Sequence, residues 1–180
     1  MNTRTVILWD PLVRLFHWSL VLVVLANLFV NEKGEQWHQW LGYTGGAWVL
    51  LRVVWGFVGK GAARWTDFFP TPTRLWQHAR ALLRGEPYHR MGHSPIGALV
   101  MLLMMLCVLG LAVTGFMYLH SERFGYELWL EDLHSLLAAS LLTLVCVHIV
   151  AAVFESWRLK ENLPLSMITG KRRLRDDAQE

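Results

Sequence analysis

The stretch that decides the fold is Asp132–Trp157, with the sequence DLHSLLAASLLTLVCVHIVAAVFESW. It is long and apolar enough to cross a membrane as one helix, since roughly 20 apolar residues span a bilayer. It carries two histidines, His134 and His148, fourteen residues apart. At about 100° and about 1.5 Å per residue, fourteen steps return to within about 40° of the same face, about 21 Å along the axis. The sequence therefore predicts one helix face with an imidazole near each side of a membrane.

The rest of the chain has the composition of a membrane protein. Of its 180 residues, 54% are hydrophobic and 17% are charged, whereas an ordinary soluble domain has about 25% charged residues. Apolar blocks of spanning length occur at about 13–30, 38–58, 95–119 and 133–156. We therefore expect an all-α, up-and-down transmembrane four-helix bundle. It forms one domain, 1–170, and the charged tail 171–180 is expected to be disordered.

The charges between these blocks predict the topology. Basic residues gather before the first block, between the second and third, and after the fourth, whereas the other two connections are mainly acidic. Because Lys and Arg accumulate in cytoplasmic loops, we expect a multi-pass protein of the bacterial inner membrane with both termini in the cytoplasm. No small-residue cleavage site follows the first block, so a cleaved signal peptide is not expected. The net charge of +3 reflects this asymmetry, and no nucleic-acid partner is expected.

The middle loop is predicted to hold a short amphipathic helix at the cytoplasmic interface. Arg74–Leu83 has apolar residues at helical spacing, and Thr73 is the expected N-cap. Two histidines of the same loop, His78 and His89, are expected to be exposed to solvent.

Four of the eight histidines pair by depth under this topology. His17 and His148 fall toward the cytoplasmic side, whereas His38 and His134 fall toward the outer side. We interpret each pair as the two axial ligands of one b-type haem, whose porphyrin supplies four further nitrogens. Two imidazoles alone would leave a bare zinc or iron ion under-coordinated. The alternative for each histidine is a structural ring held by hydrogen bonds, although intramembrane ionisable residues are usually functional.

Three glycines and two arginines are predicted to surround the haems. Gly42, Gly45 and Gly46 stand four, seven and eight residues after His38 on the same face, where they would make room for a porphyrin; ordinary helix packing is the alternative. Arg52, a cation well inside a span, is expected to pair with a haem propionate, with snorkelling to lipid as the alternative. Arg14 is a second candidate for a propionate.

Two further histidines lie at the ends of the third block. His93 is a candidate for anchoring a propionate or a quinone carbonyl, with a role as an interfacial cap as the alternative. His120 has a similar position at the outer end. The two cysteines, Cys107 and Cys146, form no CxxCH motif, which excludes covalent c-type haem on this chain. No catalytic residue is assigned.

Several motifs resemble one known superfamily. They are Trp9–Trp18 (WDPLVRLFHW), Arg52–Gly59 (RVVWGFVG), Gly92–Ala98 (GHSPIGA), and Glu161-Asn162 through Thr169–Arg172. Together they are similar to the prokaryotic cytochrome b561 and nickel-iron hydrogenase b-type cytochrome superfamily, and the spacing of His134 and His148 is the most specific part. The resemblance covers nearly the whole chain. It implies a dihaem membrane cytochrome that exchanges electrons with the quinone pool, with the ligands at His17, His38, His134 and His148.

Two functions from different classes follow. The favoured one is an electron relay across the inner membrane between quinone and a periplasmic partner, either a cytochrome c or a redox enzyme subunit. The alternative is an enzyme, a stand-alone quinol oxidase of a small oxidant such as superoxide. A transporter or structural assembly subunit would contain no haem. The sequence leaves a homodimer open.

Overall fold

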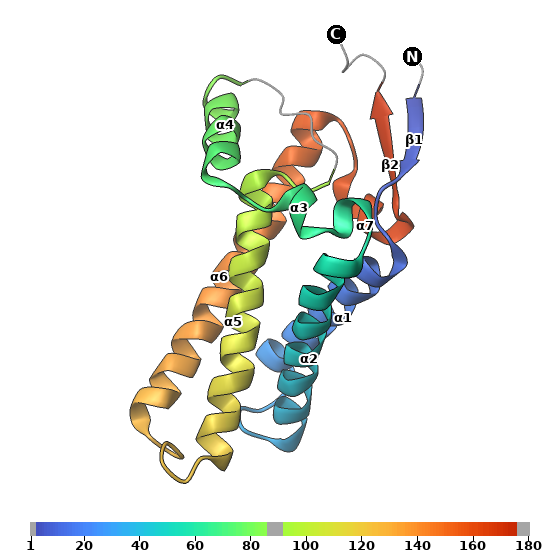
Figure 1. The fold of residues 1–180 in the computed structure, drawn as a ribbon. Helices are drawn as coiled ribbons and strands as arrows, with labels where there is room; N and C mark the ends of the chain where they lie inside the picture. The colour runs from blue at the N-terminus through green and yellow to red at the C-terminus, as the bar shows by residue number, and fades with distance from the viewer. Residues whose placement is uncertain (1–2, 86–91, 176–180) are drawn as a thin grey trace. The chain divides into compact units, whose positions relative to one another are not determined.

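The structure is a computed structural model that describes residues 3–85 and 92–175 (Figure 1). Among the described helices, four are long and apolar enough to cross a membrane, judged by length and composition. They are α1 (Pro11–Phe29), α2 (Gln36–Val58), α5 (Pro95–His120) and α6 (Leu128–Leu159). The prediction of a mostly helical membrane protein with four long apolar helices is therefore confirmed.

Helix α6 is longer than the apolar block that predicted it. It begins at Leu128 rather than at residue 133, and its first turn contains Glu131. A carboxylate in the first turn interacts favourably with the positive end of the helix dipole. Leu130, in the same turn, is only 1% exposed and anchors this end. Hydropathy alone placed the start of the helix too late because it measures preference for lipid and not the capacity to be helical.

One compact unit comprises residues 15–54 and 102–146, with segments of all four long helices. Glycines allow neighbouring helices to approach closely within it. A Cβ atom on Gly46 of α2 would lie 2.9 Å from the Cβ of Ala112 on α5. One on Gly110 of α5 would lie 2.9 Å from Cδ1 of Leu137 on α6. Both distances are shorter than carbon–carbon contact. At Gly46 the neighbouring Cβ cannot move away, so this packing requires glycine, as is common between membrane helices, whereas at Gly110 the end of the Leu137 side chain would have to shift.

Consecutive helices in this unit run antiparallel. Asn27 near the end of α1 donates a hydrogen bond to the carbonyl of His38 at the start of α2, at 3.2 Å. Thr114 near the end of α5 likewise contacts His134 near the start of α6. Short connections between helices produce antiparallel neighbours, and here they bring residues from all four long helices to the same end of the unit.

A second compact unit comprises, of the described residues, 3–14, 55–85, 92–101 and 147–175. Its short elements are β1 (Thr3–Ile7), the 3-10 helix η1 (Gly61–Ala63), α3 (Trp65–Phe68), α4 (Pro72–Leu83), α7 (Leu163–Thr169) and β2 (Lys171–Arg175). Strands β1 and β2 pair antiparallel, with Thr3 opposite Arg175 and Ile7 opposite Lys171. The prediction of a disordered tail is therefore wrong for 171–175, and 176–180 lie outside the described residues. The chain is also not purely helical.

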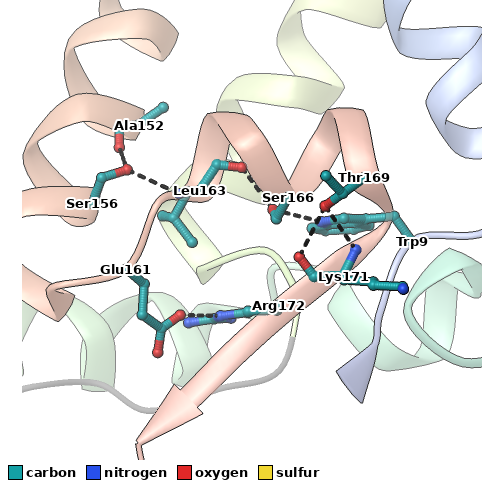
Figure 2. A network of polar contacts seen from close by, with 9 residues as sticks. All are labelled: Trp9, Ala152, Ser156, Glu161, Leu163, Ser166, Thr169, Lys171 and Arg172. Carbon is teal, nitrogen blue, oxygen red and sulfur yellow. Dashed lines mark hydrogen bonds and ion pairs between the residues drawn. The ribbon is translucent and has the colours of Figure 1, made fainter. Parts of the chain in front are cut away.

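A network of polar contacts explains why the tail is ordered (Figure 2). The Trp9 indole donates to the hydroxyl of Ser166 on α7, at 3.1 Å. The backbone amides of Leu8 and Trp9 donate to the carbonyl of Gly170, at 2.9 and 3.2 Å. Gly170 ends α7 with φ of 77°, a left-handed conformation that favours glycine. Arg172 forms an ion pair with Glu161 (Figure 2). The bonds of Leu8 and Trp9 join residues about 160 positions apart, which local sequence patterns do not report.

Asp10 connects two helices of this unit. Its Oδ1 accepts a hydrogen bond from the Val13 amide at 2.9 Å, which makes Asp10 the N-cap of α1. Pro11 follows at the first helical position, where its missing N–H costs nothing. The second carboxylate oxygen accepts a bond from the Trp55 indole, at 2.8 Å.

Helix α4 confirms the expected amphipathic helix but begins earlier than predicted. The N-cap is Thr71 rather than Thr73, because the Thr71 hydroxyl accepts a bond from the Arg74 amide and Pro72 occupies the first turn. The sequence prediction placed the prolines before the helix. Proline is in fact favoured at the first helical position.

The substitution Asp10→Ala should lower the free energy of unfolding in detergent by about 1–3 kcal/mol, because both the helix cap and the bond to Trp55 are lost. Trp55→Phe removes only the second bond and should cost less. Denaturant titration followed by circular dichroism measures both. Equal stabilities of the wild type and Asp10→Ala would contradict this role.

Candidate functional site

Two of the predicted ligands face each other in the structure. His38 lies in the first turn of α2 and His134 in the second turn of α6. Their ring centroids are 6.2 Å apart, with the ring planes inclined by 57°. Both side chains are half-buried. The sequence pairing of these two histidines by depth thus corresponds to a direct juxtaposition of rings.

This juxtaposition fits an axial pair on one metal. An imidazole nitrogen binds a first-row metal at about 2 Å, so two axial imidazoles hold their ring centroids roughly 6 Å apart. The Nδ1 atom of His38 is buried and has no hydrogen-bond partner among the described residues. Within 3–85 and 92–175, no group of three or more His, Cys, Asp or Glu side chains could hold a bare metal ion. The donor set of two imidazoles therefore fits a haem, which brings its own four equatorial nitrogens.

Thr114 is a third member of this site that sequence analysis missed. It lies on α5, and its hydroxyl oxygen is 2.8 Å from Nδ1 of His134. The same oxygen is 2.8 Å from the Gly110 carbonyl. Metal-bound histidines nearly always use their second nitrogen in such a hydrogen bond. A hydroxyl in an otherwise apolar span was the available signal, but threonines in membrane helices usually bond only to their own backbone.

The α1–α2 connection positions His38 through its backbone. Asn27 donates to the His38 carbonyl, and Asn31 donates to the side-chain oxygen of Asn27 at 3.1 Å. A polar amide in an apolar helix is costly unless it is paired. This pairing therefore restrains the first turn of α2. Sequence analysis did not single out either asparagine.

The glycines of α2 lie against neighbouring helices. A Cβ on Gly45 would lie 3.2 Å from Cγ1 of Val23, and Gly46 packs on Ala112. For Gly42, the nearest atom outside its own helix would be Nδ2 of Asn27, at 3.9 Å. Gly45 and Gly46 thus have a structural reason to be glycine. Their role beside a porphyrin stays a prediction.

The second predicted pair, His17 and His148, falls in different compact units. Each side chain is half-buried, and the His17 ring meets the adjacent Trp18 ring edge-on at 5.0 Å. Arg52 is buried, with 1% of its surface exposed. A buried guanidinium needs an anionic or hydrogen-bonded environment. The pairing of His17 with His148 and the propionate role of Arg52 stay predictions.

Arg14 and His93 both lie in the unit that contains the termini. Arg14 donates to the Ile168 carbonyl at 2.7 Å, near the end of α7. Its Nε is buried without a hydrogen-bond partner among the described residues, so one donor remains for an anion. His93 packs between aromatic rings, 4.8 Å from Trp9 and 5.6 Å from Phe68. Neither assignment, to a propionate or to a quinone, is tested by these contacts.

The expected solvent exposure of His78 is wrong. This residue of α4 is 2% exposed, and its Nε2 lies 3.9 Å from the Glu155 carboxylate on α6. Arg158 is 3.7 Å from the same carboxylate. Burial lowers the pKa of His78 below its usual value, with a smaller raising effect of Glu155 and a lowering effect of Arg158. The amphipathic pattern identified the helix but not which polar residue faces inward. His89 lies outside the described residues.

The chain matches a known protein family over residues 8–170, the family described as prokaryotic cytochrome b561. This stretch includes every residue proposed above as a ligand or anchor of the haems. No solved structure matches the chain.

Similar proteins occur in species of Rhizobium, Bradyrhizobium and Azotobacter. A probable Ni/Fe-hydrogenase B-type cytochrome subunit of Rhizobium leguminosarum bv. viciae is 27% identical, covering 98% of this chain and 92% of its own. Proteins with the same description from Bradyrhizobium diazoefficiens and Azotobacter vinelandii are 26% and 27% identical over 96% of this chain, covering 87% and 90% of their own.

Three observations support the same family assignment. They are the four apolar helices, the facing histidine pair and the family match over nearly the whole chain. The chain belongs to the prokaryotic cytochrome b561 family: it is a multi-pass membrane b-type cytochrome, homologous to cytochrome b subunits of hydrogenases.

Proposed function

We propose that this cytochrome holds two b haems and relays electrons between the quinone pool and a periplasmic redox partner. His38 and His134 would hold the haem on the periplasmic side, and His17 and His148 would hold the haem on the cytoplasmic side. The observation that carries the proposal is the separation of 6.2 Å between the rings of His38 and His134. A b haem supplies one-electron oxidation and reduction when it is bound.

The surrounding residues have distinct tasks in this proposal. Asn27 holds the backbone of His38, and the close packing at Gly46 and Gly110 fixes the distances between the ligand-bearing helices. Arg52 and Arg14 offer guanidinium donors to propionates, because charge-assisted hydrogen bonds are the strong ones. The apolar helices exclude water from the ligands, so the histidines tune the haems through burial and hydrogen bonding.

The partner is a redox enzyme subunit or a cytochrome c. The relatives are described as probable Ni/Fe-hydrogenase B-type cytochrome subunits, which supports a partner that is itself a redox enzyme. The acidic connections around Glu32 and Glu127 lie on the periplasmic side in the proposed orientation. A partner with a basic surface would be attracted to them, and its binding would weaken with salt.

The ligand assignment predicts selective loss of haem. His134→Ala should remove one haem per chain and leave the one held by His17 and His148, whereas His148→Ala should remove the other. Haem per chain and the reduced absorption bands of the purified variants measure this.

His120→Ala is the matched control, because His120 lies near the same end of the bundle but stacks on Phe116, at 4.8 Å. It should retain both haems. Two haems in His134→Ala, or one in His120→Ala, would contradict the assignment.

The relay function predicts that the purified chain accepts electrons from a short-chain quinol but does not turn over by itself. Quinol oxidation should stop once both haems are reduced. It should continue only when an oxidised periplasmic partner is added to accept electrons from the haems. Stopped-flow absorption measures both phases. Sustained quinol oxidation by the chain with superoxide alone would instead show the stand-alone oxidase.

The orientation predicts opposite results for two fusions. Green fluorescent protein after Glu180 should fluoresce, because the C-terminus is cytoplasmic by the distribution of Lys and Arg. Alkaline phosphatase inserted after Tyr126 should be active, because that connection is periplasmic. The reversed pattern would overturn the topology.

A further inference from the structure

We propose that Thr114 is a positioning residue that fixes the tautomer of His134, so that Nε2 is the nitrogen available to the metal. This inference rests on the proposed ligation of a haem by His134. It deepens that proposal, because it names the residue and the atom that prepare the ligand for binding.

The tautomer follows from a count of protons. The Thr114 hydroxyl has one proton and lies 2.8 Å from the Gly110 carbonyl and 3.3 Å from the Leu111 carbonyl. A carbonyl oxygen only accepts, so the hydroxyl donates its proton to the backbone of α5. Toward Nδ1 of His134, also at 2.8 Å, the hydroxyl oxygen must then accept. Nδ1 therefore carries the hydrogen, and Nε2 keeps its lone pair.

The opposite tautomer would be costly at this position. If Nδ1 were bare, Thr114 would have to turn its proton away from Gly110. Thr114 is only 5% exposed, so water is not at hand to replace the broken bond. Nε2 would then carry a hydrogen and could not bind a metal. Because no other partners are close by, an apolar environment strongly favours one arrangement of the protons in such a network.

The ring position is restrained by a neighbour of Thr114 as well. A Cβ on Gly115 would lie 3.5 Å from Cε1 and 4.0 Å from Nδ1 of His134. The imidazole thus packs beside the backbone of α5 while its nitrogen is held by the preceding residue. By contrast, Nδ1 of His38 has no hydrogen-bond partner in the described part of the chain. Within this pair, His134 is the oriented ligand.

A hydroxyl acceptor has a different effect from a carboxylate. A carboxylate would draw the Nδ1 proton strongly and bury a negative charge inside the bundle, which is expensive in a membrane. The neutral hydroxyl orients the ring and raises the basicity of the ligand only moderately. Removing it should make His134 a weaker electron donor, which favours the reduced metal and raises the midpoint potential.

The chain contains a matched control for the structural role of such a hydroxyl. Thr143 on α6 donates to the Ala139 carbonyl at 2.9 Å, the same bond to the preceding turn that Thr114 makes to Gly110. Within the described residues, the Thr143 hydroxyl does not bond to a histidine. Thr143→Val therefore measures what the loss of a helix-directed hydroxyl does by itself, and Thr114→Ser keeps the hydroxyl at the site.

The first experiment reads the tautomer in haem-free protein labelled with 15N-histidine, in which nitrogen chemical shifts distinguish Nδ1–H from Nε2–H. The wild type and Thr114→Ser should show His134 as the Nδ1–H form, identified by its loss in His134→Ala. Thr114→Val should show a mixture of forms, and Thr143→Val should match the wild type. An Nε2–H form in the wild type, or no change in Thr114→Val, would overturn the inference.

The second experiment measures haem affinity and midpoint potential in the haem-loaded chain. Thr114→Val should lower the affinity for one haem by about tenfold to a hundredfold, as for other partners of metal-bound histidines, and raise the potential of that haem alone. Thr114→Ser should restore both values, and Thr143→Val should leave both unchanged. Equal effects of Thr114→Val and Thr143→Val would reduce Thr114 to a packing role and overturn the inference.

The two proposals fail in different ways. If His134→Ala keeps both haems, the ligand assignment is wrong, whatever Thr114 does to the tautomer. If His134→Ala loses one haem while Thr114→Val binds both with wild-type affinity and potential, the ligand assignment stands and the role of Thr114 is wrong.

Discussion

An imidazole in an apolar helix has two ring nitrogens that need partners where water is scarce. At His134 the surrounding helices provide for this need. One nitrogen bonds to Thr114 at 2.8 Å, and the ring faces His38 across the bundle. A buried polar group without partners costs free energy, so such a ring is retained where it has a use. The arrangement draws on α2, α5 and α6 together. No single helix supplies both partners of His134.

That arrangement depends on how closely the helices approach. Gly46 against Ala112 and Gly110 against Leu137 leave no space for a further carbon atom. In lipid, association of helices relies on such packing, because burying apolar side chains brings little gain over contact with hydrocarbon. Two of the glycines first considered for a porphyrin, Gly45 and Gly46, thus also have a packing role.

The unit that contains both termini is organised by polar contacts of long sequence range. The Trp9 indole bonds to Ser166 (Figure 2). The Trp9 backbone amide bonds to the Gly170 carbonyl, and β1 pairs with β2. Asp10 caps α1 and also holds the indole of Trp55. The motifs around Trp9–Trp18 and Glu161–Arg172 are therefore structural partners as well as family signatures.

The sequence by itself determined the membrane class and the four helices, because hydrophobic length is a local property of a helix. From the loop charges it also predicted that His38 and His134 lie at the same depth, and the structure brings their rings together. The sequence did not determine the inward-facing His78, the cap at Thr71, the strand at Lys171–Arg175 or the hydroxyl of Thr114 beside His134. Three of these features depend on contacts between distant segments, and the cap depends on which proline begins the helix. Tertiary structure decided them because the partner of a polar group is set by packing in three dimensions, whereas hydropathy and periodicity describe one helix at a time.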